Sequence, residues 1–514
     1  MLASKHGALV IKTRELLQQL NPELADDRVA LQKAGEQRDR KDKGAWIAEA
    51  LSLRIAQIAE NDVPGLVVVD SVRIPGQVDA LRRAFGSLVH HIHLRAQPAT
   101  LESRWRERDG KSPGITRYED LSNSTTERNV DRLASIADLV VETDRCTADA
   151  VCVRATALLQ LYSRSSARNV DVLVGGQYGS EGKGNIVAHI APEYELLVRV
   201  GGPNAGHQVF GDPVEVYYHL PSGSERAPRA KILLGAGAVI NVEKLLLEIQ
   251  THKLEKGRLF IDRNALVIEE RDLVLEKEKL HVIGSTGQGV GAASARRIID
   301  RGQPAPDNVR QAKHIPELRD YLCDAQEILE AAYLRQAPIL LEGTQGTSLS
   351  LLHGPYPFVT SRDTTAQGCL SDAGIAASRV RRVIMVCRTY PIRVGGTSGD
   401  LDLETDWTTI EQRAGLEAGS LKAKEKTTTT KRDRRVGEFD WVQLRRSSLL
   451  NAPTDIAITF ADYISAKNKN AYRFEQLSPE SLRFVDEVER VSGSRVSLIS
   501  TDFSWRNVID RRAW

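Results

Sequence analysis

The feature that most constrains this chain is a glycine-rich stretch, Asp171 to Ile190, which reads DVLVGGQYGSEGKGNIVAHI. Its first residues form a short apolar run that ends at two glycines, as in a buried strand that breaks into a turn. From Lys183 onward the apolar residues return at helical spacing, so the glycines lie between a strand and a helix. Uncovered backbone N–H groups, a helix N-terminus and a lysine together form a cradle for phosphate. The stretch therefore predicts a phosphate-binding loop in an α/β fold.

This loop is not a Walker A motif. Gln177 stands where that motif needs its first glycine, five residues before Gly182. Gly184 stands where Ser or Thr would hold magnesium. We therefore expect a different class of nucleotide loop.

Two glycine-rich segments resemble the adenylosuccinate synthetase family. GGQYGSEGKG at 175–184 matches the first loop of the family, and GGPNAGH at 201–207 matches its second. The chain departs from the family at Ser180, which stands where the family has its catalytic aspartate. The same replacement is found in the phage relatives that act on deoxyguanylate. The closer resemblance is therefore to the 2-aminoadenylosuccinate synthetases.

The length of 514 residues suggests two or three domains. We expect a first domain at 1–162, a polar linker at 163–169 and a second domain at 170–514. For the second domain, the synthetase resemblance implies an α/β fold with a large central sheet. In the first, apolar runs separated by helical patterns predict a parallel α/β sheet. These predicted strands are 66–70, 89–94 and 138–142.

The first domain resembles a nucleoside monophosphate kinase. VVVDSVRIPGQVDALRRAF at 67–85 looks like the strand and helix around that family's Asp-x-x-Arg, and RWRERDG at 104–110 looks like its lid. No G-x-x-x-x-G-K-[ST] occurs in the sequence. Either the true start lies upstream, or this kinase-like domain has lost its phosphate cradle. Without that cradle, a solvated helix face is the favoured interpretation of Arg104, Arg106 and Arg108, ahead of a phosphate clamp.

The synthetase resemblance implies a set of residues that bind the substrate nucleotide. Thr286 and Thr360 would contact its phosphate, Gln345 its base, and the backbone of Val394 its ribose. Arg296 would reach into the nucleotide site of a neighbouring subunit, which implies a homodimer. The complete set is Asn204, Thr286, Arg296, Gln345, Thr360, Val394 and Arg432.

TTTTKRDRR at 427–435 resembles the loop that closes over L-aspartate in this family. A dicarboxylic amino acid needs fixed cationic forks, which arginines supply, and threonines add further donors. The residues assigned to aspartate are Thr429, Thr430, Arg432 and Arg434. A basic run can also be a solvated face or a nucleic-acid patch, but no aromatic residues are interleaved here, which argues against nucleic acid.

The phosphoryl donor is assigned by the same resemblance to Gly179, Glu181, Gly182, Lys183, Gly184, Asp462 and Ser500. The family reads the guanine of GTP through Thr-Lys-x-Asp and Ser-Thr-Gly-Pro. This chain has TFAD at 459–462 and STDF at 500–503. An aromatic residue can stack on any purine, so we expect ATP or dATP rather than GTP. The resemblance also implies Mg²⁺, with Ser180 and the Gly206 carbonyl as ligands.

The resemblance implies a reaction that joins L-aspartate to C6 of a 6-oxopurine nucleotide, GMP or dGMP, through a 6-phosphoryl intermediate. The residues expected to carry the chemistry are Ser180, Lys183, His207 and Gln345. A serine hydroxyl is a weak base, so Glu181, a water molecule or the substrate itself must take the N1 proton. Ser180 offers instead room and a neutral acceptor beside C2, where guanine has its amino group.

Three alternatives stay open. The first is an ordinary adenylosuccinate synthetase that uses IMP and GTP. The second is an inactive nucleotide sensor, against which the retention of Lys183, His207, Arg432 and Arg434 speaks. The third makes the N-terminal half the active enzyme, which the missing Walker A motif disfavours. The choice between ribose and deoxyribose is also open.

The overall charge and composition indicate a cytoplasmic protein without a membrane or nucleic-acid partner. The formal charge is +2 from 70 basic and 68 acidic residues, which gives no polyanion-binding signal. No apolar run approaches 18 residues, and Met1 is followed by no signal-like segment. The five cysteines form no C-x-x-C pair, so we expect reduced thiols.

Overall fold

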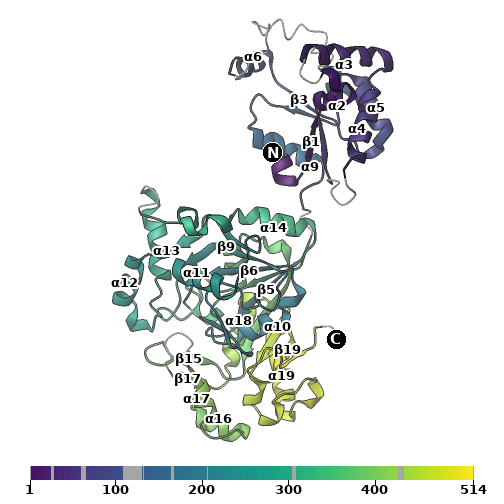
Figure 1. Cartoon of the computed structure of the whole chain (residues 1–514). Coiled ribbons are helices and arrows are strands. Elements are labelled where there is room, and N and C mark those ends of the chain that lie inside the picture. The colour runs from purple at the N-terminus through teal and green to yellow at the C-terminus, as the bar shows by residue number, and fades with distance from the viewer. Residues whose placement is uncertain are drawn as a thin grey trace. The chain divides into compact units, whose positions relative to one another are not determined.

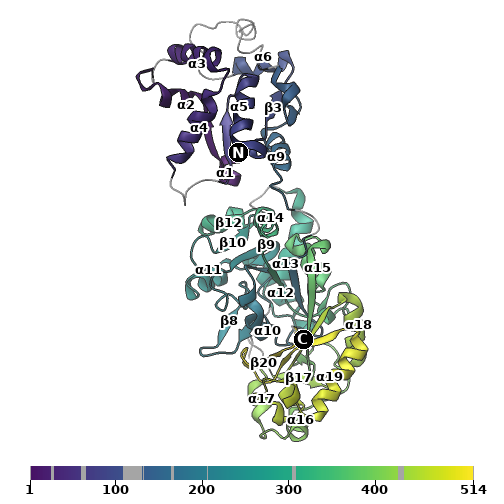
Figure 2. The same cartoon turned by 90° about the vertical axis from the view of Figure 1, so that its right-hand side faces the viewer.

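The structure, a computed structural model, divides into two compact units, residues 1–162 and 163–514. The colours of Figures 1 and 2 follow the chain from the first unit, in purple and blue, to the second, in teal to yellow. The residues described are 2–24, 28–58, 65–107, 130, 132–163, 167–204, 206–303, 308–426 and 433–512.

The first unit contains two pairs of parallel strands. β1 (Leu9–Lys12) pairs with β2 (Val67–Asp70), and β3 (Ile92–Arg95) pairs with β4 (Leu139–Glu142). The parallel direction agrees with the prediction, but within the described residues β2 and β3 are not paired, so the single sheet predicted is instead two. The helices described here are α1 (Leu2–His6), α2 (Thr13–Leu20), α3 (Arg28–Asp42), α4 (Trp46–Ala56), α5 (Pro75–Phe85), α6 (Pro98–Glu107) and α9 (Ala148–Leu158).

The arginines of α6 have structural partners. Arg104 donates to the hydroxyl of Thr143 at 2.8 Å and to its carbonyl at 2.7 Å. Arg106 forms an exposed i,i+4 ion pair with Glu102. Arg108 lies outside the described residues. These contacts favour the interpretation of α6 as a helix with a solvated face over a phosphate clamp.

The second unit is built on a sheet of eleven strands in the order β12-β10-β9-β6-β13-β5-β14-β18-β19-β20, with β11 beside β9. All neighbours are parallel except β19 and β20. This is the large central sheet that the resemblance implied. The strands are β5 (Val170–Gly175), β6 (Leu196–Gly201), β9 (Lys231–Ile240), β10 (Leu259–Asp262), β11 (Leu266–Val267), β12 (Leu322–Cys323), β13 (Ile339–Glu342), β14 (Val380–Arg388), β18 (Asp455–Thr459), β19 (Arg495–Ser500) and β20 (Val508–Asp510).

Helices cover both faces of this sheet, as Figure 1 shows around β5, β6 and β9. Alternate residues of the buried strand β5 explain why, because Val172 belongs to one buried cluster with residues of α14, α15 and α19, whereas Leu173 belongs to another with residues of α10. The helices are α10 (Lys183–Ile190), α11 (Val242–Thr251), α12 (Glu270–Lys279), α13 (Val290–Ile299), α14 (Ala325–Leu334), α15 (Ala366–Ala373), α16 (Trp407–Ala414), α17 (Ser420–Lys424), α18 (Trp441–Asn451) and α19 (Pro479–Ser492).

Two small antiparallel sheets complete the second unit. β7 (His207–Val209) pairs with β8 (Glu215–Tyr217), and β17 (Arg434–Gly437) lies between β15 (Ile392–Val394) and β16 (Glu404–Thr405). Because the central strands run parallel, the loops after β5, β6, β13, β14 and β18 all leave the same edge of the sheet. That edge is where a ligand site is expected.

All five cysteines are free thiols, namely Cys146, Cys152, Cys323, Cys369 and Cys387. Across the described ranges, no helix has the length and apolar character that a bilayer crossing requires.

Candidate active site

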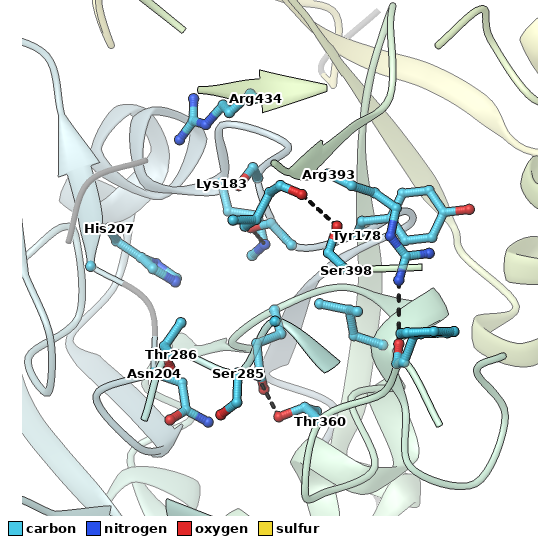
Figure 3. A pocket seen from close by; sticks show the side chains of 18 of the residues that line it. Tyr178, Lys183, Asn204, His207, Ser285, Thr286, Thr360, Arg393, Ser398 and Arg434 are labelled. Atoms are coloured by element: carbon cyan, nitrogen blue, oxygen red, sulfur yellow. Dashed lines mark hydrogen bonds between the residues drawn. The ribbon is translucent and has the colours of Figure 1, made fainter. Parts of the chain in front are cut away.

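A cavity of about 290 Å³ lies at this edge of the sheet. The loops that follow the central strands supply its lining, and Figure 3 shows side chains from several of them converging on it. Many of the residues predicted from the sequence line it together, although they are spread over more than 250 positions of the chain. They are Gly179, Ser180, Gly182, Lys183, Gly184, Asn204, Gly206, His207, Thr286, Gln345, Thr360, Val394 and Arg434.

The carboxylate of Glu181 holds the glycine-rich loop in place through hydrogen bonds. Its Oε1 accepts the N–H groups of Gln177 at 3.0 Å and Gly179 at 2.7 Å, and its Oε2 lies 2.7 Å from Lys183 Nζ. Glu181 is 1% exposed and is not part of the cavity lining. Its carboxylate is occupied in organising the loop, and its predicted contact with the donor stays a prediction.

The backbone conformation of Gly182, at the end of this loop, requires glycine. Its φ is 82°, in the left-handed region, and it is the N-cap of α10. A Cβ atom at this position would meet the ring of Phe460 at 3.3 Å. The loop therefore packs closely against an aromatic side chain that also lines the cavity.

His207 points its free nitrogen into the cavity. Its Nδ1 lies 2.6 Å from Glu342 Oε1, whereas its buried Nε2 has no partner. Burial, with Arg199 beside it, lowers the pKa of His207 to about 4. Burial would raise the pKa of Glu342, but Arg199 and His207 hold it at about 2. We infer a neutral imidazole that donates from Nδ1 and presents a lone pair at Nε2.

A cluster of amide and hydroxyl groups forms another wall of the cavity, where Figure 3 shows Asn204, Ser285, Thr286 and Thr360 near one another. Gln345, which has a left-handed φ of 65°, donates from Nε2 to Thr360 Oγ1 at 2.6 Å. The buried Oδ1 of Asn204 has no partner, as is also true of Ser361 Oγ beside this wall. Buried polar atoms without partners are rare, and the Oδ1 of Asn204, which lines the cavity, is available to a ligand there. Sequence reasoning missed Ser285 and Ser361, although they are the chain neighbours of the predicted residues Thr286 and Thr360.

Arg393 and Tyr178 form a further part of the lining that sequence reasoning missed. The guanidinium group lies 4.4 Å from the centre of the tyrosine ring and donates to the carbonyl of Asp400 at 3.0 Å. The backbone of Val394 is predicted to contact ribose, and its carbonyl accepts a hydrogen bond from Ser398. The sequence did contain signals for both residues. Arg393 precedes Val394 in one matched motif, and Tyr178 is the aromatic residue of the glycine-rich loop.

Arg296 does not reach outward. It is 8% exposed, and its guanidinium binds Asp272 at 3.0 and 2.7 Å and the carbonyls of Asn308 and Val267. All three of its guanidinium nitrogens are bonded within its own chain. Its role in a neighbouring subunit and the homodimer that this role implied stay predictions.

The two residues predicted to bind the donor base do not line the cavity either. Ser500 donates to the carbonyl of Asp502. Asp462 is buried, its Oδ1 has no partner, and burial together with Asp502 raises its pKa to about 7. Their contact with the donor stays a prediction. The aromatic residues Phe210, Phe460 and Phe503 do line the cavity.

The segment predicted to bind aspartate is described only in part. Thr429, Thr430 and Arg432 fall in 427–432, outside the described residues. Arg434 follows at the start of β17 and lines the cavity (Figure 3).

The chain matches the family model of adenylosuccinate synthetase over residues 172–313 and 306–469. It is 36% identical over 350 residues to adenylosuccinate synthetase of Methanocaldococcus jannaschii, which covers 66% of this chain and 96% of the relative. It is also 36% identical over 348 residues to that of Archaeoglobus fulgidus, with 66% and 98% covered.

The chain belongs to the adenylosuccinate synthetase family. It is accordingly a ligase that forms a C–N bond and binds nucleotide substrates. The family match lies entirely within the second unit.

Two solved structures of synthetases share the fold. One is succinoaminodeoxyadenylate synthetase of cyanophage S-2L, bound to dGMP and to dATP as an energy donor. The likeness has a TM-score of 0.56 and 28% identity, and it covers 67% of this chain and 95% of the phage chain. The other is fully ligated adenylosuccinate synthetase from Plasmodium falciparum, with a TM-score of 0.58, 24% identity and coverage of 67% and 100%.

Proposed function

We propose that this ligase joins L-aspartate to C6 of dGMP or GMP, with ATP or dATP as phosphoryl donor. The product is an N6-succino-2-aminoadenylate or its deoxy form. The observation that carries the proposal is the position of Ser180 in the cavity lining, while Glu181 is held beneath the loop. The glycine-rich loop thus offers the base a neutral hydroxyl and no carboxylate. A hydroxyl can accept from the 2-amino group of guanine and leaves room for it.

In the first step, the γ-phosphoryl group of the donor moves to O6 of the purine, and the N1 proton leaves. Lys183 supplies fixed positive charge beside the glycine-rich loop. With Glu181 occupied, His207 is the group that fits the role of proton acceptor, because its neutral Nε2 faces the cavity. As an imidazolium paired with Glu342, it then stabilises negative charge on the phosphorylated oxygen.

In the second step, the amino nitrogen of aspartate forms a bond to C6, and the C6–O6 bond breaks with loss of phosphate. The amine loses a proton as the new C–N bond forms. Arg434 lines the cavity and supplies a guanidinium for a carboxylate of aspartate. The Arg432 side chain is proposed for the same role from its motif.

Mg²⁺, which the family resemblance implies, fits the oxygen donors of the cavity. Ser180 and Gly206 both contribute to the lining, and hard neutral oxygens together with substrate phosphates suit this ion. Within the described ranges no three His, Cys, Asp or Glu side chains are grouped to hold a metal by themselves. When bound, the ion would neutralise charge on the donor phosphates, and those phosphates would be its main ligands.

The donor base is proposed to stack on the aromatic part of the lining. Phe503 lies 5.0 Å from Phe210 and 5.2 Å from Phe460, between ring centroids. Asp462, the remaining carboxylate of the family's guanine-reading motif, is not in the lining. Stacking is independent of the hydrogen-bonding edge of a purine, so this part of the lining does not require guanine.

A phosphate-release assay with L-aspartate and ATP tests the proposal on GMP, dGMP, IMP and dIMP. We expect the guanine nucleotides to be the better substrates by kcat/KM. The Ser180→Asp variant should shift preference toward IMP, since a carboxylate restores the base of the usual family members. Equal or better use of IMP by the unaltered protein would favour an ordinary adenylosuccinate synthetase. Release that does not require aspartate would contradict both.

A further inference from the structure

A single buried carboxylate, Glu425, lies directly before the aspartate-loop segment 427–432. Its side chain is 0% exposed, and both of its oxygens are bonded. Oε1 accepts from Arg388 Nη2 at 2.7 Å and from the hydroxyl of Tyr463 at 2.6 Å. Oε2 accepts from Arg434 Nη1 at 2.8 Å. Two guanidinium groups that come from different strands therefore share one anion.

This cluster depends on the charge of Glu425. Burial alone would raise the pKa of this carboxyl, but Arg388 and Arg434 lower it to about 2. The group is therefore ionised throughout the neutral range. Removing the charge of one member of a buried ion cluster leaves its partners uncompensated, which is costly and displaces whichever partner can move.

Arg434 is the partner that can move toward solvent. It lines the cavity and its side chain is 15% exposed, whereas the side chain of Arg388 is 1% exposed. An isolated antiparallel bridge pairs Lys426 with Asp433. The ion pair between Glu425 and Arg434 joins the two residues that flank this bridge.

Arg388 connects the same carboxylate to the glycine-rich loop. Its Nη1 donates to the carbonyl of Ser180 at 3.3 Å, and its guanidinium lies 4.3 Å from the centre of the Phe460 ring. Its backbone N–H and carbonyl bind the side chain of Gln177 at 3.0 and 3.1 Å. Glu425 is thus connected to β17 through Arg434 and to the glycine-rich loop through Arg388.

We propose that Glu425 is a positioning residue, which holds the Arg434 guanidinium in the cavity and connects the start of β17 to the glycine-rich loop. Glu425 itself does not line the cavity, so it acts through Arg434. The inference rests on the proposed function, since aspartate is the substrate that Arg434 would receive.

The test is Glu425→Gln, which keeps the shape of the side chain and removes its charge. We expect KM for L-aspartate to rise about tenfold to a hundredfold, the loss expected when a charge-assisted bond that fixes a guanidinium is removed. KM for the purine nucleotide should change by less than about threefold, since its predicted contacts lie elsewhere.

The double variant E425Q/R434A should bind aspartate no worse than Arg434→Ala alone, because Glu425 acts through that residue. Tyr463→Phe is the matched control, since it keeps the carboxylate and both arginines, and it should leave KM for aspartate nearly unchanged.

Amide hydrogen exchange of the full chain provides a readout that does not depend on activity. Exchange of β17 should be faster in Glu425→Gln than in the unaltered protein or in Tyr463→Phe. An equal loss in all kinetic parameters, an unchanged KM for aspartate, or unchanged exchange would overturn the inference. If Glu425→Gln does not fold, Glu425→Asp, which keeps the charge and moves it by one methylene, must show the same selective rise. Failure of the unaltered protein to use aspartate would instead refute the proposed function, and the exchange result would then decide the role of Glu425 alone.

Discussion

His207 and Glu342 form a buried pair in which Nδ1 is 2.6 Å from the carboxylate and Nε2 faces the cavity without a partner. The chain contains a second histidine–glutamate pair, which shows what a structural arrangement looks like. His219 Nδ1 lies 2.9 Å from Glu248, but its Nε2 accepts the N–H of Asn241 at 3.1 Å. Both ring nitrogens of His219 therefore have hydrogen-bond partners, whereas Nε2 of His207 has none and is available to a ligand.

The first prediction is that His207→Ala lowers turnover by a factor of roughly 10² to 10⁴, the usual contribution of an acid–base or charge-stabilising group. The matched control is His219→Ala, which should reduce thermal stability and leave turnover per folded molecule nearly unchanged. Steady-state kinetics and thermal melts of both variants provide the measurement. Near-normal turnover of the His207 variant would remove this residue from the chemistry.

The second prediction concerns the aromatic lining. Phe460→Ala should raise KM for ATP more than KM for the nucleotide or for aspartate. A lost base stack is worth about 1 to 3 kcal/mol, which corresponds to roughly a fivefold to hundredfold change. Asp462→Asn, in a residue outside the lining, is the comparison and should change KM for ATP much less. The reverse ranking of the two variants would show that the carboxylate reads the donor.

The third prediction is a pH effect on stability. The folded protein keeps Asp462 protonated up to a pKa of about 7, against an ordinary value of 3.8. The folded state thus holds a proton that the unfolded state releases, so this group favours folding at low pH and loses that effect between about pH 4 and 7. Asp462→Asn should therefore stabilise the protein relative to the unaltered chain more at pH 8 than at pH 5. Urea denaturation at the two pH values measures this difference, and a difference independent of pH would contradict it.

The fourth prediction separates the two units. Residues 163–514 should retain the ligase reaction, because the family match and the cavity both lie there. Residues 1–162 should show no phosphoryl transfer from ATP to nucleoside monophosphates, since no Walker A sequence occurs among the 514 residues. Coupled assays on the separately expressed units test both statements. Formation of a nucleoside diphosphate by the first unit would refute the second one.

The sequence by itself predicted the elements whose geometry is local. The strand, glycine loop and helix from Val170 to Ile190 follow from glycine placement and apolar spacing within one short stretch. The motif matches also placed Gln345 and Thr360 in one site, and the structure brings them within 2.6 Å. Such motifs can be recognised because each constrains the backbone over only a few neighbouring residues.

Only the tertiary structure decided which charged residues face the cavity. Glu181, Arg296 and Asp462 lie inside or close to matched motifs, yet each is buried outside the lining. The roles of Glu342 and Glu425 could not be read from the sequence, because their partners His207 and Arg388 lie far away along the chain. A charged side chain can face a ligand or pair with another charge, and its sequence neighbours do not distinguish these outcomes. The choice depends on which opposite charge the fold brings within about 3 Å in a buried, weakly screened environment.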